Sequence, residues 1–138
     1  MIVLSRKIIY IINPISGTRK KTKLQTYIEQ ETGKRGIPFK IFPSVASGDY
    51  SFLKPSLKEE GFTDIVIAGG DGTISQVIGN FLHEKINFGI IPCGSGNGLA
   101  LTAGIPKDHK KALQIIFEGR HGMIDGFTVN GHFACMLC

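Results

Sequence analysis

The sequence has few cysteines, and this shortage excludes whole classes of protein. Its 138 residues include three Cys, too few and wrongly placed for the disulfide framework of a small secreted domain. Cys135 and Cys138 form a C-x-x-C pair, but a zinc site needs two more ligands and a thioredoxin-type site opens a helix after a strand. We expect buried thiols at both positions. Because the sequence fixes no histidine or acid near Cys93, we expect a small loop residue there rather than a nucleophile.

Long hydrophobic runs are also missing. The apolar run Ile8–Ile12 has the length of a strand, and the sequence shows neither a membrane-length segment nor a cleavable signal sequence. Aromatic residues do not alternate with basic ones, so nucleic acid is not an expected partner. The four histidines lack metal-binding spacing and are expected at exposed helix and turn positions. These absences predict a cytoplasmic protein, and they leave open a peripheral contact with the membrane surface.

Glycine and positive charge are plentiful instead. Of the 18 glycines, most of the informative ones lie in three short clusters, and such clusters favour close backbone contact with a ligand. The net charge of +5 favours anionic partners, such as nucleotide phosphates or an acidic membrane face. The length fits one domain with one substantial core.

Short apolar runs alternate with helical patterns, which predicts an α/β fold with a parallel sheet and helices on both faces. Strands are expected at Ile8–Ile12, Phe39–Phe42, Asp64–Ala68 and Phe88–Ile91. Helices are expected after Asn13-Pro14 as far as Gly33, over Asp49–Glu60, over Thr73–Leu82, from Leu99 to Ala103, and over His109–Glu118. Because Pro55 lies inside the second of these, that helix is expected either to be kinked at Pro55 or to start near Lys54.

The last segment changes character. Met123–Val129 and His132–Leu137 flank Asn130-Gly131, which is a strong hairpin signal. An antiparallel ribbon after a series of βα units suggests the entry to another domain. Because the sequence stops at Cys138 inside an apolar run, we expect residues 1–138 to be a fragment of a longer protein.

Three loops of small and polar residues follow three of the expected strands. They are Asn13-Pro14-Ile15-Ser16-Gly17, Gly69-Gly70-Asp71-Gly72-Thr73 and Gly94-Ser95-Gly96-Asn97-Gly98. A parallel sheet places all three at the carboxyl edge of its strands, where ligands bind in open α/β sheets. Backbone N–H groups and helix N-termini there form an anion site. One such loop is a weak signal, but three together predict a site for nucleotide phosphates.

Common nucleotide-binding motifs do not account for these loops. The sequence has no GxxxxGK[ST], which excludes a P-loop protein, and Gly94-Ser95-Gly96 does not continue to the last glycine of a dinucleotide fingerprint. Asp71 is the one carboxylate in the glycine clusters. It could hydrogen-bond an acceptor hydroxyl or a Mg²⁺-bound water, or it could simply form a turn and cap the next helix.

The ordered loops, with Pro92-Cys93 before the third, resemble the signature of the diacylglycerol kinase catalytic domain, and the resemblance covers essentially all of the chain. Gly94-Ser95-Gly96-Asn97 followed by Leu99-Ala100 is particularly similar to the sphingosine kinase branch. Ser44 stands where the family often has a nucleotide-binding Thr, with Gly48-Asp49 matching the Gly-Asp after it. Asp125 matches an acid common before the family's second domain.

This resemblance implies an ATP-dependent kinase that uses Mg²⁺ and transfers the γ-phosphate to a lipid hydroxyl, as in diacylglycerol or a sphingosine-like base. Residues 1–138 would be its nucleotide-binding N-terminal domain, followed by a mainly β domain that the sequence lacks. Asp71 is the implied catalytic residue, and its contact with Mg²⁺ through water is one option for the unassigned metal site. The implied nucleotide-binding residues are Asn13, Pro14, Ile15, Ser16, Gly17, Ser44, Gly69, Gly70, Asp71, Gly72, Thr73, Gln76, Gly94, Ser95, Gly96 and Asn97.

Two departures from the family pattern keep alternatives open. Gln76 stands where the family usually has Glu, and Gly79-Asn80 replaces its Asn-Gly pair. A nucleotide-binding module without catalysis therefore remains an alternative to the lipid kinase. GGDGT also occurs in NAD kinases and phosphofructokinases, but the Asn-Glu pair and the Gly-Phe-Leu segment expected of an NAD kinase are missing. The sequence identifies neither the acceptor lipid nor the oligomeric state.

Overall fold

The centre of the fold is a four-stranded parallel sheet in the order β2-β1-β3-β4. The computed structural model describes residues 6–13, 18–93, 98, 104–118, 124–129 and 132–137. Every residue of β1 (Ile8–Ile12) and of β3 (Asp64–Gly69) is buried, because these two strands are central and covered on both faces. The outer strands β2 (Phe39–Pro43) and β4 (Asn87–Pro92) are more exposed. This burial explains the continuous apolar runs of the central strands.

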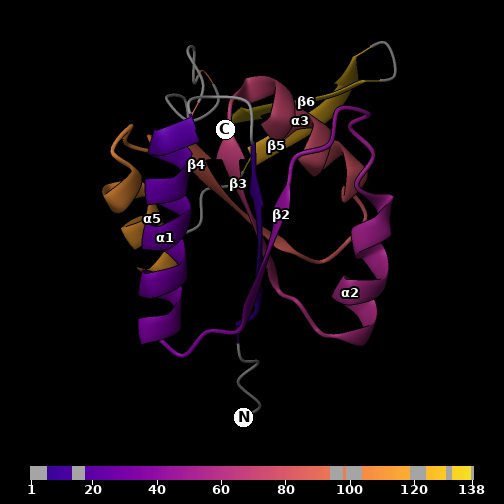
Figure 1. The fold of residues 1–138 in the computed structure, drawn as a ribbon. Coiled ribbons are helices and arrows are strands. Elements are labelled where there is room, and N and C mark those ends of the chain that lie inside the picture. The colour runs from indigo at the N-terminus through magenta and orange to yellow at the C-terminus, as the bar shows by residue number, and fades with distance from the viewer. Residues whose placement is uncertain are drawn as a thin grey trace.

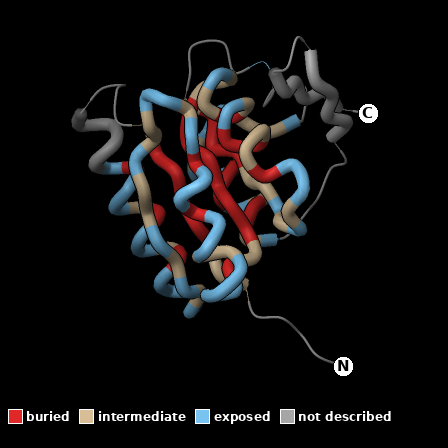
Figure 2. The backbone as a smooth tube through the Cα atoms, turned by 90° about the vertical axis from the view of Figure 1, so that its right-hand side faces the viewer, coloured by how far each residue is buried: buried red, intermediate tan, exposed pale blue. Residues whose placement is uncertain are grey.

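Helices cover both faces of the sheet, as the sequence predicts (Figure 1). One face packs against α1 (Thr18–Lys34) and α5 (His109–Glu118), and the other packs against η1 (Ser51–Leu53) and α3 (Asp71–Asn80). Leu57, in the short helix α2 (Lys54–Glu59), also packs against this second face. The period of two along β1 sends Ile9 and Ile11 to the α3 side and Ile8, Tyr10 and Ile12 to the α1 side. Figure 2 shows the buried strands enclosed by exposed helix surfaces.

The boundaries of two helices differ from those expected from the sequence: α1, and α3, which spans Asp71–Asn80 rather than Thr73–Leu82. Helix α1 continues through Gly33 to Lys34, and the chain turns instead at Gly36, whose φ of 66° is in the left-handed region. The second helical segment is split into η1 and α2, with Pro55 in the first turn of α2, where its missing N–H costs nothing. The start near Lys54 is therefore confirmed. The expected helix over Leu99–Ala103 lies outside the described residues.

The last two described strands, β5 (Ile124–Val129) and β6 (His132–Leu137), pair antiparallel with each other and not with the main sheet. Strand β6 lies beside α3. Met123 and the Asn130-Gly131 turn lie outside the described residues, and the further β domain stays a prediction. Among the helices in the described ranges, none combines the length and the apolar character needed to cross a bilayer.

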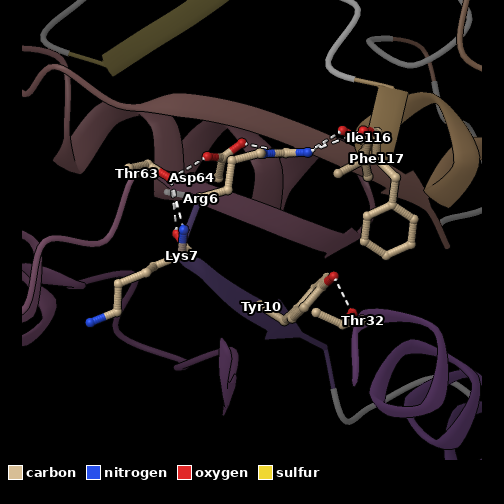
Figure 3. Close-up of polar contacts among 8 residues, drawn as sticks. All are labelled: Arg6, Lys7, Tyr10, Thr32, Thr63, Asp64, Ile116 and Phe117. Atoms are coloured by element: carbon tan, nitrogen blue, oxygen red, sulfur yellow. Dashed lines mark hydrogen bonds and ion pairs between the residues drawn. The ribbon is translucent and has the colours of Figure 1, made fainter. Parts of the chain in front are cut away.

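A polar cluster fixes the amino edge of the sheet, opposite the predicted site (Figure 3). Arg6 donates to the buried carboxylate of Asp64 at 2.7 Å and to the carbonyl oxygen of Ile116 at 2.9 Å. The Thr63 hydroxyl donates to the other carboxylate oxygen of Asp64 at 2.6 Å. Arg6 therefore joins the start of β3 to the last turn of α5, where a positive charge also suits the helix dipole.

Tyr10 and Thr32 form a second buried polar pair, with 2.7 Å between their hydroxyl oxygens. Burial raises the pKa of Tyr10 to about 12, against the lowering effect of the Thr32 hydrogen bond. In the folded protein the pKa of the Tyr10 hydroxyl is above its ordinary value of 10.0. The contribution of the protonated hydroxyl to the free energy of unfolding is therefore complete below pH 10 and is lost as the pH rises toward 12.

We expect Tyr10→Phe to flatten this alkaline loss of stability. Two pKa units correspond to about 2.7 kcal/mol of unfolding free energy, so the wild type should lose roughly that much more than the variant between pH 10 and 12. Urea unfolding of both proteins across this range measures the difference. Equal slopes for the two proteins would contradict the raised pKa.

Candidate functional site

The carboxyl ends of the parallel strands form one continuous rim. Hydrogen bonds continue past the strand ends: Ser44 N donates to Ile12 O at 3.1 Å, Asn13 N to Ala68 O at 3.0 Å, and Cys93 N to Gly69 O at 3.1 Å. Because the strand order is β2-β1-β3-β4, the residues that follow these strands lie next to one another along the rim in that same order. The predicted convergence is confirmed for the residues that anchor the loops.

Several predicted site residues lie outside the described residues. These are Pro14, Ile15, Ser16, Gly17, Gly94, Ser95, Gly96 and Asn97. The rim residues that are described are Asn13, Ser44, Gly69, Gly70, Asp71, Gly72 and Thr73, together with Gln76 one turn along α3. For both groups of residues, contact with a nucleotide stays a prediction.

Helix α3 begins directly at the rim. Gly70 is its N-cap in an extended conformation (φ −94°, ψ −177°) and, as a glycine, supplies no side-chain cap of its own. The first helical hydrogen bond runs from Ile74 N to Gly70 O at 3.0 Å. The earlier N–H groups of a helix have no acceptor within it and carry partial positive charge. The glycine-rich turn therefore presents a favourable end for an anion at the rim.

The two glycines on either side of this turn have different surroundings. A Cβ added at Gly69 would lie 3.2 Å from Thr73 Cβ, so the side chain of Thr73 packs closely over the end of β3. Among the described residues, a Cβ added at Gly72 would meet no atom within 4 Å outside its own helix backbone and chain neighbours. Gly72 is also exposed. The space above it is thus open for a ligand to approach the backbone.

Asp71 connects α3 to the loop that follows β4. Its Oδ2 accepts a hydrogen bond from the backbone N–H of Gly98 at 2.9 Å, although the two residues belong to different glycine clusters. Gly98 packs so closely that an added Cβ would lie 3.2 Å from the same oxygen. Asp71 therefore holds two of the predicted loops together, in addition to starting a helix.

The loop after β2 approaches α3 from the other side. Gly48 has a φ of 73°, and an added Cβ would lie 3.0 Å from Gln76 Cδ. Next to it, the backbone N–H of Ser51 lowers the pKa of Asp49 by donating to its carboxylate, at 2.9 Å. Gln76 is therefore a packing partner of this loop, a role that the sequence alone does not predict.

A Cys–His contact at the end of β4 also escaped the sequence analysis. His109 Nε2 lies 3.7 Å from Cys93 Sγ and 3.0 Å from the carbonyl oxygen of Pro92. The expectation that His109 is an exposed helix residue is wrong, because it is only partly exposed and is hydrogen-bonded to the rim. His109 lies 16 residues after Cys93, a separation with no recognisable motif. We infer only that His109 fixes the start of α5 against the end of β4.

The residues at the rim do not form a complete metal cage. Within the described residues, no three His, Cys, Asp or Glu side chains come together as a group that could hold a metal ion. Asp71 places one carboxylate at the rim. This donor set suits Mg²⁺ only as an ion held mainly by phosphate oxygens and water, which is its common mode in phosphoryl-transfer sites.

The chain is similar to diacylglycerol kinases in sequence and in fold. The diacylglycerol kinase of Bacillus subtilis (strain 168) is 32% identical over 126 residues, covering 89% of this chain and 42% of that protein. The diacylglycerol kinase of Staphylococcus carnosus (strain TM300) is 26% identical over 125 residues, covering 89% and 41%. The crystal structure of a diacylglycerol kinase from Bacillus anthracis str. Sterne has the same fold, with a TM-score of 0.77 and 23% identity over 93% of this chain and 49% of that one.

The chain thus spans about two fifths of the length of these two curated relatives. A family model for the diacylglycerol kinase catalytic domain matches residues 7–129, which include the rim and all four strands of the main sheet. Because this match covers most of the sequence, the chain belongs to the diacylglycerol kinase catalytic domain family.

Proposed function

We propose that the full-length protein is a lipid kinase that transfers the γ-phosphate of ATP to a lipid hydroxyl. In this proposal, residues 1–138 form its nucleotide-binding N-terminal domain. The observation that carries it is the rim, where α3 begins with a glycine-rich turn between the ends of β1 and β4, with the end of β2 next along the rim. Family membership supports the same reaction class, since the relatives compared above are named diacylglycerol kinases.

The rim fits the demands of phosphoryl transfer. This reaction depends on positioning and on neutralising phosphate charge more than on covalent chemistry by the protein. The N-terminus of α3 and the open space over Gly72 suit the phosphates of ATP. Ser44 and Asn13, on neighbouring strand ends, would contact the rest of the nucleotide. Mg²⁺, when bound with the nucleotide, would neutralise charge on the phosphate oxygens.

Asp71 would orient the acceptor. Its carboxylate starts α3 and accepts the Gly98 N–H, so its position is fixed from both sides of the rim. From there it could accept the proton of a lipid hydroxyl as that oxygen attacks the γ-phosphorus. The acceptor lipid would reach this edge from a membrane surface, which the net charge of +5 favours when the lipids are anionic.

The direct test is phosphorylation of a lipid panel by the full-length protein with labelled ATP and Mg²⁺. The panel contains diacylglycerol, a sphingosine-like base and NAD⁺ as a non-lipid acceptor, each offered in mixed micelles or solution. We expect label in one of the lipids and none in NAD⁺. Label in NAD⁺ alone would replace the lipid kinase by an NAD kinase-like enzyme.

A second candidate function rests on Gln76. The neutral Gln76 amide packs against Gly48, at a position where the family usually has an acid. If this change removes catalysis, the protein should bind ATP in isothermal titration and transfer no label to any acceptor. That outcome would favour the nucleotide-binding module, and absence of ATP binding would contradict both functions.

A further inference from the structure

The segment Ser44–Tyr50, which we call the β2 loop, is attached to the sheet at its first residue. Ser44 N donates to Ile12 O at 3.1 Å, which places Ser44 on the rim. The rest of the loop packs on the α3 face of the sheet through Val45 and Tyr50, with Gly48 N donating to Val45 O at 3.1 Å across a tight turn. The ring of Tyr50 is fully buried, and its hydroxyl accepts the N–H of Val45 at 3.0 Å. The loop therefore has internal order, but its position depends on what it packs against.

Asn80, in the last turn of α3, supplies that support. Its Oδ1 accepts the backbone N–H of Tyr50 at 3.0 Å, and its Nδ2 donates to the carbonyl oxygen of Gly48 at 2.8 Å. Nδ2 also donates to Gln76 O at 2.7 Å within the helix. The amide thus uses its acceptor and both of its donors. A backbone donor and a backbone acceptor of the β2 loop are satisfied by this one side chain.

Gln76 completes the contact one turn earlier. It lies four residues before Asn80, so both side chains project from the same face of α3. Gly48 sits against Gln76 so closely that an added Cβ would be 3.0 Å from its Cδ, and the φ of 73° there also favours glycine. The loop backbone is therefore held between two neighbouring amide side chains of one helix.

The helix that holds the β2 loop is the helix that begins the proposed phosphate site. Its first residue, Asp71, lies at the rim, and its last residue, Asn80, carries the loop. Because α3 is buried along Ile74, Val77 and Ile78, it behaves as a rigid link between the two parts. Ser44 and the turn at Gly70–Thr73 are therefore kept at a fixed distance from each other.

We propose that Asn80 is a positioning residue for the nucleotide, acting through the β2 loop. Together with the hydrogen bond from Ser44 N to Ile12 O, its two loop contacts hold Ser44 in register with the N-terminus of α3, so that one nucleotide can contact both. This inference rests on the proposed function, because it requires the rim to bind ATP.

The test compares Asn80→Ala with Thr32→Val in the full-length protein. Asn80→Ala removes both contacts to the loop. Thr32→Val removes the buried hydrogen bond to Tyr10, on the α1 face of the sheet, and serves as a control that also destabilises the fold. Amide hydrogen exchange reports the β2 loop, and isothermal titration with Mg²⁺–ATP reports nucleotide binding. Steady-state kinetics then separate KM for ATP from kcat.

We expect faster exchange of the Tyr50 and Gly48 amides in Asn80→Ala and a Kd and KM for ATP raised about tenfold or more, by analogy with the ~10–100-fold losses when a residue that orients a metal ligand is removed. The kcat at saturating ATP should change little. Thr32→Val should lower Tm and leave both ATP constants unchanged. If Asn80→Ala does not fold, Asn80→Asp asks the same question, because it keeps an acceptor for Tyr50 N–H but cannot donate to Gly48 O.

Each of the other outcomes would contradict the proposed role of Asn80. Unchanged exchange in the loop would show that Asn80 does not hold it. Faster exchange with unchanged ATP constants would show that the loop has no part in nucleotide binding. An equal loss of ATP affinity in Thr32→Val would show that the loss in Asn80→Ala comes from general destabilisation of the fold. Absence of ATP binding by the wild type would overturn the proposed function, and this inference with it, whatever the exchange rates show.

Discussion

Replacing Asp71 by Asn in the full-length protein is expected to lower kcat by about 10²–10⁴-fold, the usual loss when a general base is removed. The negative charge of Asp71 is what the proposed mechanism uses, and Asn cannot accept a proton from a lipid hydroxyl. The fold should survive, because an Asn side-chain oxygen can still accept the Gly98 N–H that Asp71 binds at 2.9 Å. Loss of a negative charge at the start of α3 costs only about 0.3–1 kcal/mol.

The measurement is kcat at saturating ATP with the best lipid acceptor, alongside thermal unfolding of both proteins. A second variant, Asp71→Ala, separates structure from chemistry. It removes the acceptor for Gly98 as well as the charge, so it should lower Tm more than Asp71→Asn while lowering kcat to a similar extent. Near-normal kcat in Asp71→Asn would show that Asp71 only connects the two loops. Catalysis would then rest on groups other than Asp71.

The fold was predictable because its main signals are local. The apolar runs at Ile8–Ile12 and Ile65–Ala68 are too uniformly hydrophobic for a strand with a solvent-facing side, and both lie in buried central strands. The glycine-rich turn after β3 marked the carboxyl edge, and strand parallelism then placed Asn13 and Ser44 beside it. These inferences needed only residue type, spacing and the rule that parallel strands end on one side.

The contacts within the site were not predictable for the opposite reason. Asp71 binds the amide of a residue 27 positions later, and Asn80 binds Tyr50 across 30 positions. Neither pair has a spacing that a helix or a strand imposes, so only the packed fold brings them together. From the sequence, Asn80 stands out only as a departure from a family pattern. The available signal was a second amide, Asn80, four residues after Gln76 on one face of the expected helix.

Gly72→Val should abolish nucleotide binding without unfolding the protein. Because a Cβ at Gly72 would meet no other atom of the described residues within 4 Å, the described fold has room for the larger side chain. Within a helix, Val is also intrinsically no worse than Gly. The branched side chain would instead occupy the open space at the start of α3, where the phosphates are proposed to approach the backbone. We expect the Kd for ATP to rise beyond about 1 mM, the limit of useful titration.

The matched control is Gly33→Val, which makes the same chemical change in another helix. Gly33 is also helical and also has no protein atom within 4 Å of an added Cβ, but it lies near the end of α1, away from the rim. Both variants should therefore unfold near the wild-type Tm, and only Gly72→Val should lose ATP binding in isothermal titration. Wild-type affinity in Gly72→Val would mean that no phosphate comes close to this turn. The anion site would then have to be built from the loops after β1 and β4, with α3 serving only to support them.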